Sequence, residues 1–179
     1  MPLANPLTID DFERLPDALA LNHELVDGKL VDVSGNTPIH NDLRDYLISL
    51  LRDYVKQNGL GKVLSKQEFD FGGNAHGPDV AFFGPEKLAR LQERLRVQRF
   101  VPDLAIEIVS QNDTFARLTQ KAVKYREHGT QEVWILDLDS RRAFVFSPDR
   151  NEILDESRRF ASPLLPGFSI GIADLFDRR

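Results

Sequence analysis

Two strand-like runs of apolar residues, each carrying one acidic residue, occupy the middle of the chain. They are 78–83, Pro-Asp-Val-Ala-Phe-Phe, and 103–109, Asp-Leu-Ala-Ile-Glu-Ile-Val. In the second run, period-two alternation puts Glu107 on one face with Ala105 and Val109, and the opposite face is also apolar. A strand that is apolar on both faces is typical of the centre of a sheet, so we expect Glu107 to be buried.

The rest of the pattern predicts elements around this centre. We expect a short helix at 8–15, a hairpin at 23–33 turning at Asp-Gly, an amphipathic helix at 40–58, strand segments at 63–65 and 68–71, helices at 85–99 and 114–128, strands at 133–137 and 143–146, and an extended tail closed by a helical turn near 170–176. This order predicts an α/β fold, with a mixed β-sheet flanked by helices and an N-terminal helix and β-hairpin. No repeat or linker interrupts it, so we expect a single domain over residues 1–179.

The predicted helix at 85–99 is basic, and two interpretations of it stay open. Its leucines, at Leu88, Leu91 and Leu95, can pack it as a solvated flap whose charges face water. Alternatively, its lysine and arginines contact nucleic acid.

Composition and charge narrow the function. The chain has no cysteine, which excludes disulfides, thiolate metal sites and cysteine nucleophiles. Its net charge of -5 argues against a protein that coats nucleic acid, although one local basic face could still meet DNA. Neither a leader-like N-terminus nor a long apolar run is present, so we expect a cytoplasmic protein with no membrane partner.

The acidic residues of the two strands are the first chemical signal. An ionised carboxylate in an apolar run is costly to bury unless it shifts its pKa, finds a partner or binds a metal. If the two strands are neighbours, Asp79 and Glu107 can converge as oxygen ligands of a hard divalent cation. Lys121 lies at helical spacing with Leu118 and Ala122, so it is expected to face inward and pair with Glu107 or share its cleft.

Several motifs, in this order, carry a resemblance to a known family. They are Glu-Leu-Val-Asp-Gly at 24–28, a histidine at the start of the long helix, Pro-Asp-Val at 78–80, Pro-Asp-Leu-Ala-Ile-Glu-Ile-Val-Ser at 102–110, and Lys-x-x-x-Tyr at 121–125. The chain resembles the Uma-two family of putative restriction endonucleases, which is built on the PD-(D/E)xK nuclease fold. The resemblance continues through 131–137 and 163–176 and so covers nearly the whole chain.

The resemblance implies a restriction endonuclease-like core and a specific set of site residues. Asp79 and Glu107 would be catalytic acids that bind Mg²⁺, or Mn²⁺ in its place, and Glu24 would be an auxiliary metal ligand. The lysine usual two residues after the glutamate is replaced by Val109, and Lys121 would take its catalytic place. His40 matches a family position whose role the sequence does not define.

Each of these residues also has a purely structural explanation. Asp79 can cap a turn, Glu107 can form a buried ion pair, and Lys121 can extend its ammonium group to water. Glu24 can be a cross-strand polar residue, and His40 can simply begin a helix.

Three functions are therefore compared. The first is a Mg²⁺-dependent endonuclease that hydrolyses phosphodiester bonds of DNA, for which a homodimer would present two sites to a duplex. The second is a catalytically inactive nuclease-fold protein that binds nucleic acid or a protein partner without cleavage. The third, a carboxylate-pair hydrolase of small substrates, leaves Lys121 unexplained.

Overall fold

The computed structural model describes residues 6–110 and 113–178. The helices, in chain order, are α1 (Ile9–Glu13), α2 (Asp17–Ala20), α3 (Pro38–Gln57), α4 (Pro85–Leu88), α5 (Phe115–Glu127) and α6 (Ile172–Asp177). The strands are β1 (His23–Val26), β2 (Lys29–Asp32), β3 (Lys62–Ser65), β4 (Glu68–Asp70), β5 (Ala75–His76), β6 (Val80–Phe83), β7 (Val97–Gln98), β8 (Leu104–Ile108), β9 (Glu132–Asp137), β10 (Arg142–Phe146), β11 (Asn151–Leu154), β12 (Arg159–Ala161) and β13 (Ser169–Gly171).

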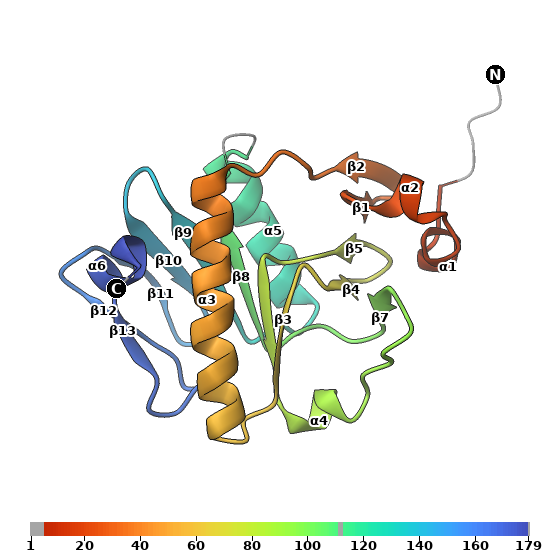
Figure 1. Ribbon diagram of the computed structural model, residues 1–179. Helices are drawn as coiled ribbons and strands as arrows, with labels where there is room; N and C mark the ends of the chain where they lie inside the picture. Colours follow the sequence, from red (N-terminus) through yellow and green to blue (C-terminus); the bar gives the residue numbers. More distant parts are fainter. Residues whose placement is uncertain (1–5, 111–112, 179) are drawn as a thin grey trace.

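The larger sheet has the strand order β11-β10-β9-β8-β6-β3. β8 and β9 are parallel, whereas β8 and β6 are antiparallel, so the sheet is mixed. The long helix α3 crosses one face of this sheet and α5 lies behind the other (Figure 1). A smaller sheet, β2-β1-β5-β4-β7, joins the N-terminal hairpin to the middle of the chain. The predicted mixed sheet flanked by helices is thus confirmed.

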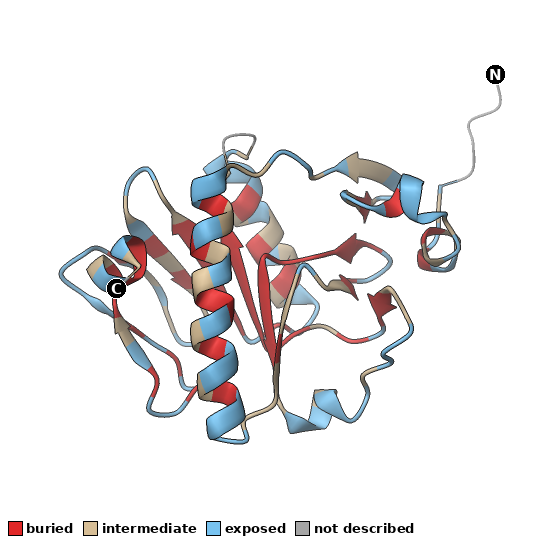
Figure 2. Cartoon of the chain, viewed as in Figure 1, coloured by how far each residue is buried: buried red, intermediate tan, exposed pale blue. Residues whose placement is uncertain are grey.

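Alternation along β8 divides the hydrophobic core between the two faces of the sheet. Leu104, Ile106 and Ile108 pack in one cluster with the apolar side of α3, while Ala105 packs in another with the apolar side of α5. The central strands are almost wholly buried, and α3 is buried along the side facing them (Figure 2). The alternation places Glu107 with Ala105, on the face covered by α5, as predicted.

The predicted N-terminal helix and hairpin are also present. Thr8 and Asp11 form a capping box, in which each side chain accepts a hydrogen bond from the other's backbone N–H. The hairpin turns at Asp27 and Gly28, both at positive φ (49° and 74°), as a tight turn between twisted strands requires. β1 then pairs with β5 through Leu25 and Ala75. The N-terminal hairpin and strands that come after α3 in the chain therefore form one sheet.

The prediction of a helix over 85–99 is wrong beyond the first turn. α4 ends at Leu88, and the segment after it is irregular until the short strand β7. The carboxylate of Glu13 accepts hydrogen bonds from the backbone N–H groups of Arg96 (2.7 Å) and Val97 (2.9 Å). Val97 is completely buried beside the N-terminal helices. These distant contacts hold the segment extended, and they outweigh a helical pattern whose local preference is weak.

The basic side chains of this segment mostly bind acids of the same chain. Arg96 pairs with Asp17 and Lys87 with Asp103, each at 2.6 Å. Arg99 pairs in the same way with an acid of α1. The segment is thus tied down by internal ion pairs, which favours its structural interpretation over the nucleic-acid contact.

The segment at 62–71 forms two strands that belong to different sheets. β3 is the edge strand of the larger sheet and β4 lies in the smaller one. The break occurs at Lys66, whose φ of 52° is uncommon for a residue with a side chain. Strands β5, β7, β11, β12 and β13 were not predicted, because each is short and lacks an alternating pattern of its own.

Within the described part of the chain, none of the helices combines the length and the apolar character needed to cross a membrane.

Candidate active site

The structure brings the two predicted acids together on neighbouring strands. β6 and β8 pair antiparallel, with Val80 opposite Ile106, and Asp79 lies directly before β6. Asp79 Oδ2 accepts a hydrogen bond from the backbone N–H of Ile108 at 2.9 Å, so the Asp79 carboxylate reaches the backbone next to Glu107. Asp79 and Glu107 are only 2% and 5% exposed, respectively.

Asp79 is held by two cationic or polar side chains. The Lys66 ammonium group lies 2.6 Å from Oδ1, and His40 Nε2 lies 3.3 Å from Oδ2. Burial alone would raise the pKa of Asp79, but the hydrogen bond from His40 and the charge of Lys66 outweigh it and lower the pKa to about 2. Asp79 is therefore ionised throughout the neutral range.

Glu107 uses one of its oxygens for bonds within the protein. Its Oε1 accepts a hydrogen bond from the Tyr125 hydroxyl at 2.7 Å and lies 3.0 Å from Lys121 Nζ. Within the described residues, Oε2 has no donor, and Glu107 lines the pocket described below. Burial raises the pKa of Glu107, Lys121 lowers it, and the charges of Asp79 and Glu24 raise it, so that the net shift is upward.

Lys121 faces inward from α5, as its helical spacing predicts, and bridges two acids. Its Nζ donates to Glu24 Oε1 at 2.9 Å in addition to contacting Glu107. Burial would lower the pKa of Lys121, but the charges of Glu107 and Glu24 raise it well above its ordinary value. Lys121 is thus a permanent cation at the centre of the site.

Glu24 reaches the site from the N-terminal hairpin, and all its described contacts are with donors. Oε1 also accepts from the backbone N–H of Gly77 at 3.0 Å, and Oε2 lies 2.8 Å from His76 Nδ1. Burial raises the pKa of Glu24, but Lys121 and His76 together lower it well below its ordinary value. With these contacts, Glu24 holds the Lys121 ammonium group in place. Metal binding by Glu24 stays a prediction.

Lys66 and the role of His40 were not predicted. In the antiparallel register of β3 and β6, Ser65 pairs with Val80, and just beyond it the Lys66 N–H donates to the carbonyl oxygen of Pro78 at 3.1 Å, which brings Lys66 beside Asp79. That pairing is the signal that could have identified Lys66, but it requires the register. His40 Nε2 also lies 3.2 Å from the carbonyl oxygen of Ile108, so the histidine contacts both acid-bearing strands.

Tyr125, the tyrosine of the Lys-x-x-x-Tyr motif, has two roles in the structure. It is fully buried and stacks on Phe71, with ring centroids 4.2 Å apart, and it also donates to Glu107. The ring packs in the core while the hydroxyl orients the carboxylate.

These residues surround an open pocket of about 270 Å³. Its lining includes Asp79, Glu107, Lys121, Lys66 and His40. No set of three or more His, Cys, Asp or Glu side chains within residues 6–110 and 113–178 is arranged as a complete metal cluster. Mg²⁺ does not require one, because it usually keeps several waters and binds through one or two carboxylates.

The pocket fits a divalent cation by its charge and, within the described chain, by a free acceptor, Glu107 Oε2. Among the described residues, Asp79 Oδ1 meets only the Lys66 ammonium group, and Glu107 Oε2 has no donor. Three buried carboxylates of the described chain, those of Glu24, Asp79 and Glu107, are near only two lysines. Burial is the main cause that raises the pKa of Glu107, and the charges of Asp79 and Glu24 raise it further; a cation in the pocket would favour the ionised form.

Comparisons with known proteins identify the family and a protein of similar fold. A family model described as Uma2, putative restriction endonuclease, matches residues 9–173. The crystal structure of a putative nuclease from Anabaena variabilis superposes with a TM-score of 0.83 at 25% identity, covering 96% of this chain and 98% of that one. A DrdV–DNA complex determined by electron cryomicroscopy matches at a TM-score of 0.43 and 17% identity, over 78% of this chain and 12% of that one, which is too weak for an argument. No curated protein matches the sequence.

Proposed function

The chain belongs to the Uma2 family of putative restriction endonucleases, and on this premise we propose that it is a metal-dependent endonuclease that hydrolyses phosphodiester bonds of DNA. The observation that carries the proposal is the convergence of Asp79, Glu107 and Lys121, from two adjacent strands and a helix, on one pocket. Nuclease function is supported by the family match and by the nuclease of similar fold. The dependence on metal and the position of cleavage within the strand are parts of the proposal.

Asp79 and Glu107 would hold Mg²⁺, with Mn²⁺ as the alternative, and Glu24 would complete the set of acids. When bound, the ion would lower the pKa of a water molecule and neutralise charge on the phosphate. The free Oε2 of Glu107 and the permanently ionised Asp79 supply the oxygen ligands that this ion prefers.

Lys121 would act as a fixed positive charge. Because its pKa is raised, it keeps its proton at neutral pH and cannot serve as a base. Its position between Glu107 and Glu24 aims the ammonium group into the pocket, where it can orient a water or stabilise charge on the phosphate. Lys121 would thereby replace the lysine that is absent at Val109.

The test is a calorimetric titration of Mg²⁺ and Mn²⁺ into the wild type and Asp79→Asn, with plasmid nicking measured on the same samples. We expect saturable binding in the wild type, and loss of both binding and nicking, by more than about 100-fold, in the variant. The melting temperature should change little, because asparagine can still accept the hydrogen bond from Ile108, and Lys66, whose side chain is 38% exposed, can turn its ammonium group to water.

Asp103→Asn is the matched control. Asp103 is also a buried acid paired with a lysine, Lys87 at 2.6 Å, but it lies at the opposite end of β8. This variant should bind metal and nick as the wild type does. Equal activity in Asp79→Asn and the wild type would contradict the proposal.

The second candidate is a nuclease-fold protein that binds nucleic acid or a protein partner without cleaving. The observation that favours it is Val109 at the position of the usual lysine. It requires salt-dependent DNA binding with no product under any divalent metal, or binding of a protein partner alone.

A homodimer and a one-domain organisation over residues 1–179 complete the proposal. A two-fold assembly would present two pockets to the two strands of a duplex. Sedimentation velocity on the purified protein tests the homodimer, and a monomer at all concentrations would contradict it.

A further inference from the structure

A second, larger pocket adjoins the carboxylate site. It has a volume of about 640 Å³, and it shares Glu24, Lys66, Val33, Ser34 and Asn36 with the smaller pocket. The two pockets therefore lie next to each other, on either side of these residues. A substrate that fills both must extend beyond the group that reacts, as a polynucleotide does.

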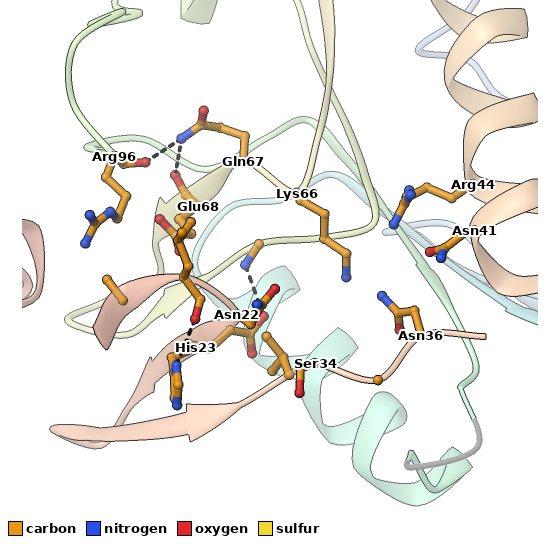
Figure 3. A pocket seen from close by; sticks show the side chains of 16 residues that line it. Asn22, His23, Ser34, Asn36, Asn41, Arg44, Lys66, Gln67, Glu68 and Arg96 are labelled. Carbon is orange, nitrogen blue, oxygen red and sulfur yellow. Dashed lines mark hydrogen bonds between the residues drawn. The ribbon is translucent and has the colours of Figure 1, made fainter. Parts of the chain in front are cut away.

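One side of this larger pocket is cationic. The side chains of Arg44, from α3, and Lys66, from the end of β3, extend into the same space, with the amides of Asn36 and Asn41 beside them (Figure 3). The acid that pairs with Arg44 is Asp45, whose side chain is 71% exposed, so the guanidinium is not locked in a buried ion pair. Such a side suits an anionic phosphate.

Glu68 lies on the other side of the pocket (Figure 3). Its carboxylate is partly buried, and no residue of the described chain gives it a hydrogen bond or an ion pair. The nearby guanidinium of Arg96 is bound instead to Asp17 and to the carbonyl oxygen of Phe12. Burial is the main cause that raises the pKa of Glu68 to about 7. A partly buried carboxylate that faces a pocket and has no donor from the described residues is free to accept a hydrogen bond from a ligand.

We infer that this pocket binds the nucleotide next to the cleaved phosphodiester as an unpaired base, and that Glu68 accepts a hydrogen bond from an exocyclic amino group of that base. Arg44 and Lys66 hold the adjoining phosphate. The inference rests on the proposed nuclease function, and it adds a substrate class: DNA that is single-stranded, or whose nucleotide is turned out of the duplex, at this position.

The chemistry of the bases makes the inference specific. Cytosine and adenine carry an amino group that can donate to a carboxylate, whereas thymine carries a carbonyl oxygen at the position of the cytosine amino group. At that position thymine would place one acceptor against another, so the hydrogen bond that the cytosine amino group donates is lost. An unpaired base is required because the pocket is concave and would admit the whole base, not only its groove edge.

The experiment measures fluorescence anisotropy of labelled oligo-dC and oligo-dT with the full chain, in EDTA and again in Ca²⁺, at about pH 8.5, where a Glu68 carboxyl with a pKa of about 7 is ionised and only accepts hydrogen bonds. The variants are Glu68→Gln, Arg44→Ala and, as a matched control, Glu86→Gln, an exposed acid of α4 outside the pocket.

The wild type and Glu86→Gln should bind oligo-dC about tenfold more tightly than oligo-dT, as expected for one base-specific contact. Glu68→Gln should reduce this preference to about twofold or less, because an amide can donate to thymine as well as accept from cytosine. Arg44→Ala should weaken both oligonucleotides equally.

Plasmid nicking by the wild type separates failure of this inference from failure of the proposed function. Nicking with equal affinity for oligo-dC and oligo-dT would overturn only the inference, as would a preference that survives in Glu68→Gln. Absence of both nicking and oligonucleotide binding would overturn the two together.

Discussion

At the scale of single residues, the site is a set of charges that depend on one another. Lys121 is close to Glu24 and Glu107 at once, and Lys66 is close to Asp79. Removing one charge from such a set leaves its partner buried without compensation, which usually costs more than the pair itself contributes.

We therefore predict that Lys121→Met destabilises the protein by about 3 kcal/mol at neutral pH. Without the ammonium group, the folded-state pKa of Glu24 should rise, and that of Glu107, which is already raised, should rise further. Stability would then be retained at low pH and lost as the pH rises through those values, so the variant should be less destabilised near pH 5 than near pH 8. Urea unfolding at both pH values measures this.

Lys124→Met, on the same helix, is the control for this prediction. Lys124 lies 3.7 Å from Asp27, whose side chain is 82% exposed, and such a pair contributes about 0–1 kcal/mol. Equal destabilisation by the two substitutions would show that Lys121 contributes no more to stability than the exposed ion pair of Lys124 does.

Glu68 gives a second prediction, with its own pH dependence. Its folded-state pKa of about 7 lies above the ordinary value of 4.5, so the folded protein keeps this proton longer than the unfolded chain. Stability is present below the ordinary value and falls as the pH rises to about 7. Glu68→Gln removes that loss, and we expect it to stabilise the protein by about 1 kcal/mol near pH 8, after allowance for solvent screening, and not at all near pH 4. Thermal unfolding across this range checks it; a gain that is independent of pH would exclude ionisation as the cause.

At the scale of elements, the turn from α3 into β3 decides how the edge strand meets β6. Gly61 has a φ of 138°, and a Cβ placed there would lie 2.1 Å from the carbonyl oxygen of Phe83 on β6. Gly59, two residues earlier, has a φ of 63° and open space around it. The first glycine is required by close approach of two backbones and the second only by its backbone conformation.

We predict that Gly61→Ala destabilises the protein by about 3 kcal/mol and Gly59→Ala by about 1 kcal/mol. The larger loss follows because the new methyl group pushes β3 away from β6, the pair that also places Lys66 beside Asp79. Urea unfolding of both variants measures the difference. If Gly59→Ala cost as much, backbone strain alone would account for both.

At the scale of the whole molecule, the buried apolar residues form three neighbouring hydrophobic clusters. One lies between α3 and the larger sheet, one between α5 and the opposite face, and a smaller one beneath the N-terminal hairpin and α1. The bridge from Glu24 through Lys121 to Glu107 ties the hairpin to the other two. This connection is the physical basis for proposing one domain over residues 1–179.

We predict that the protein unfolds in a single cooperative transition. Trp134, the sole tryptophan, reports the cluster under α3, and far-ultraviolet circular dichroism reports all elements. Because the chain has no cysteine, Leu21→Cys, at a position that is 62% exposed beside the hairpin, can carry a label there. All three probes should give one midpoint in urea. An earlier midpoint at residue 21 would contradict the one-domain proposal.

The sequence alone was sufficient where the information is local. Caps, glycines and apolar periods predicted α3, α5 and the hairpin, and period-two alternation predicted which face of β8 carries Glu107. It also predicted that Lys121 faces inward, because the helical spacing that buries Leu118 carries Lys121 with it. These features depend on neighbouring residues, whose geometry the backbone repeats.

Only the tertiary structure decided the features that join distant parts of the chain. It showed that 89–96 is not helical, that Lys66 meets Asp79, that Glu24 holds Lys121, and that Glu68 lines a pocket with no partner among the described residues. Each depends on strand register or on a contact between residues tens of positions apart, and local preference is too weak to specify either. The sequence thus determined the elements and the acids they carry, whereas long-range packing determined which charges meet, because burial and pairing energies arise only once the chain has folded.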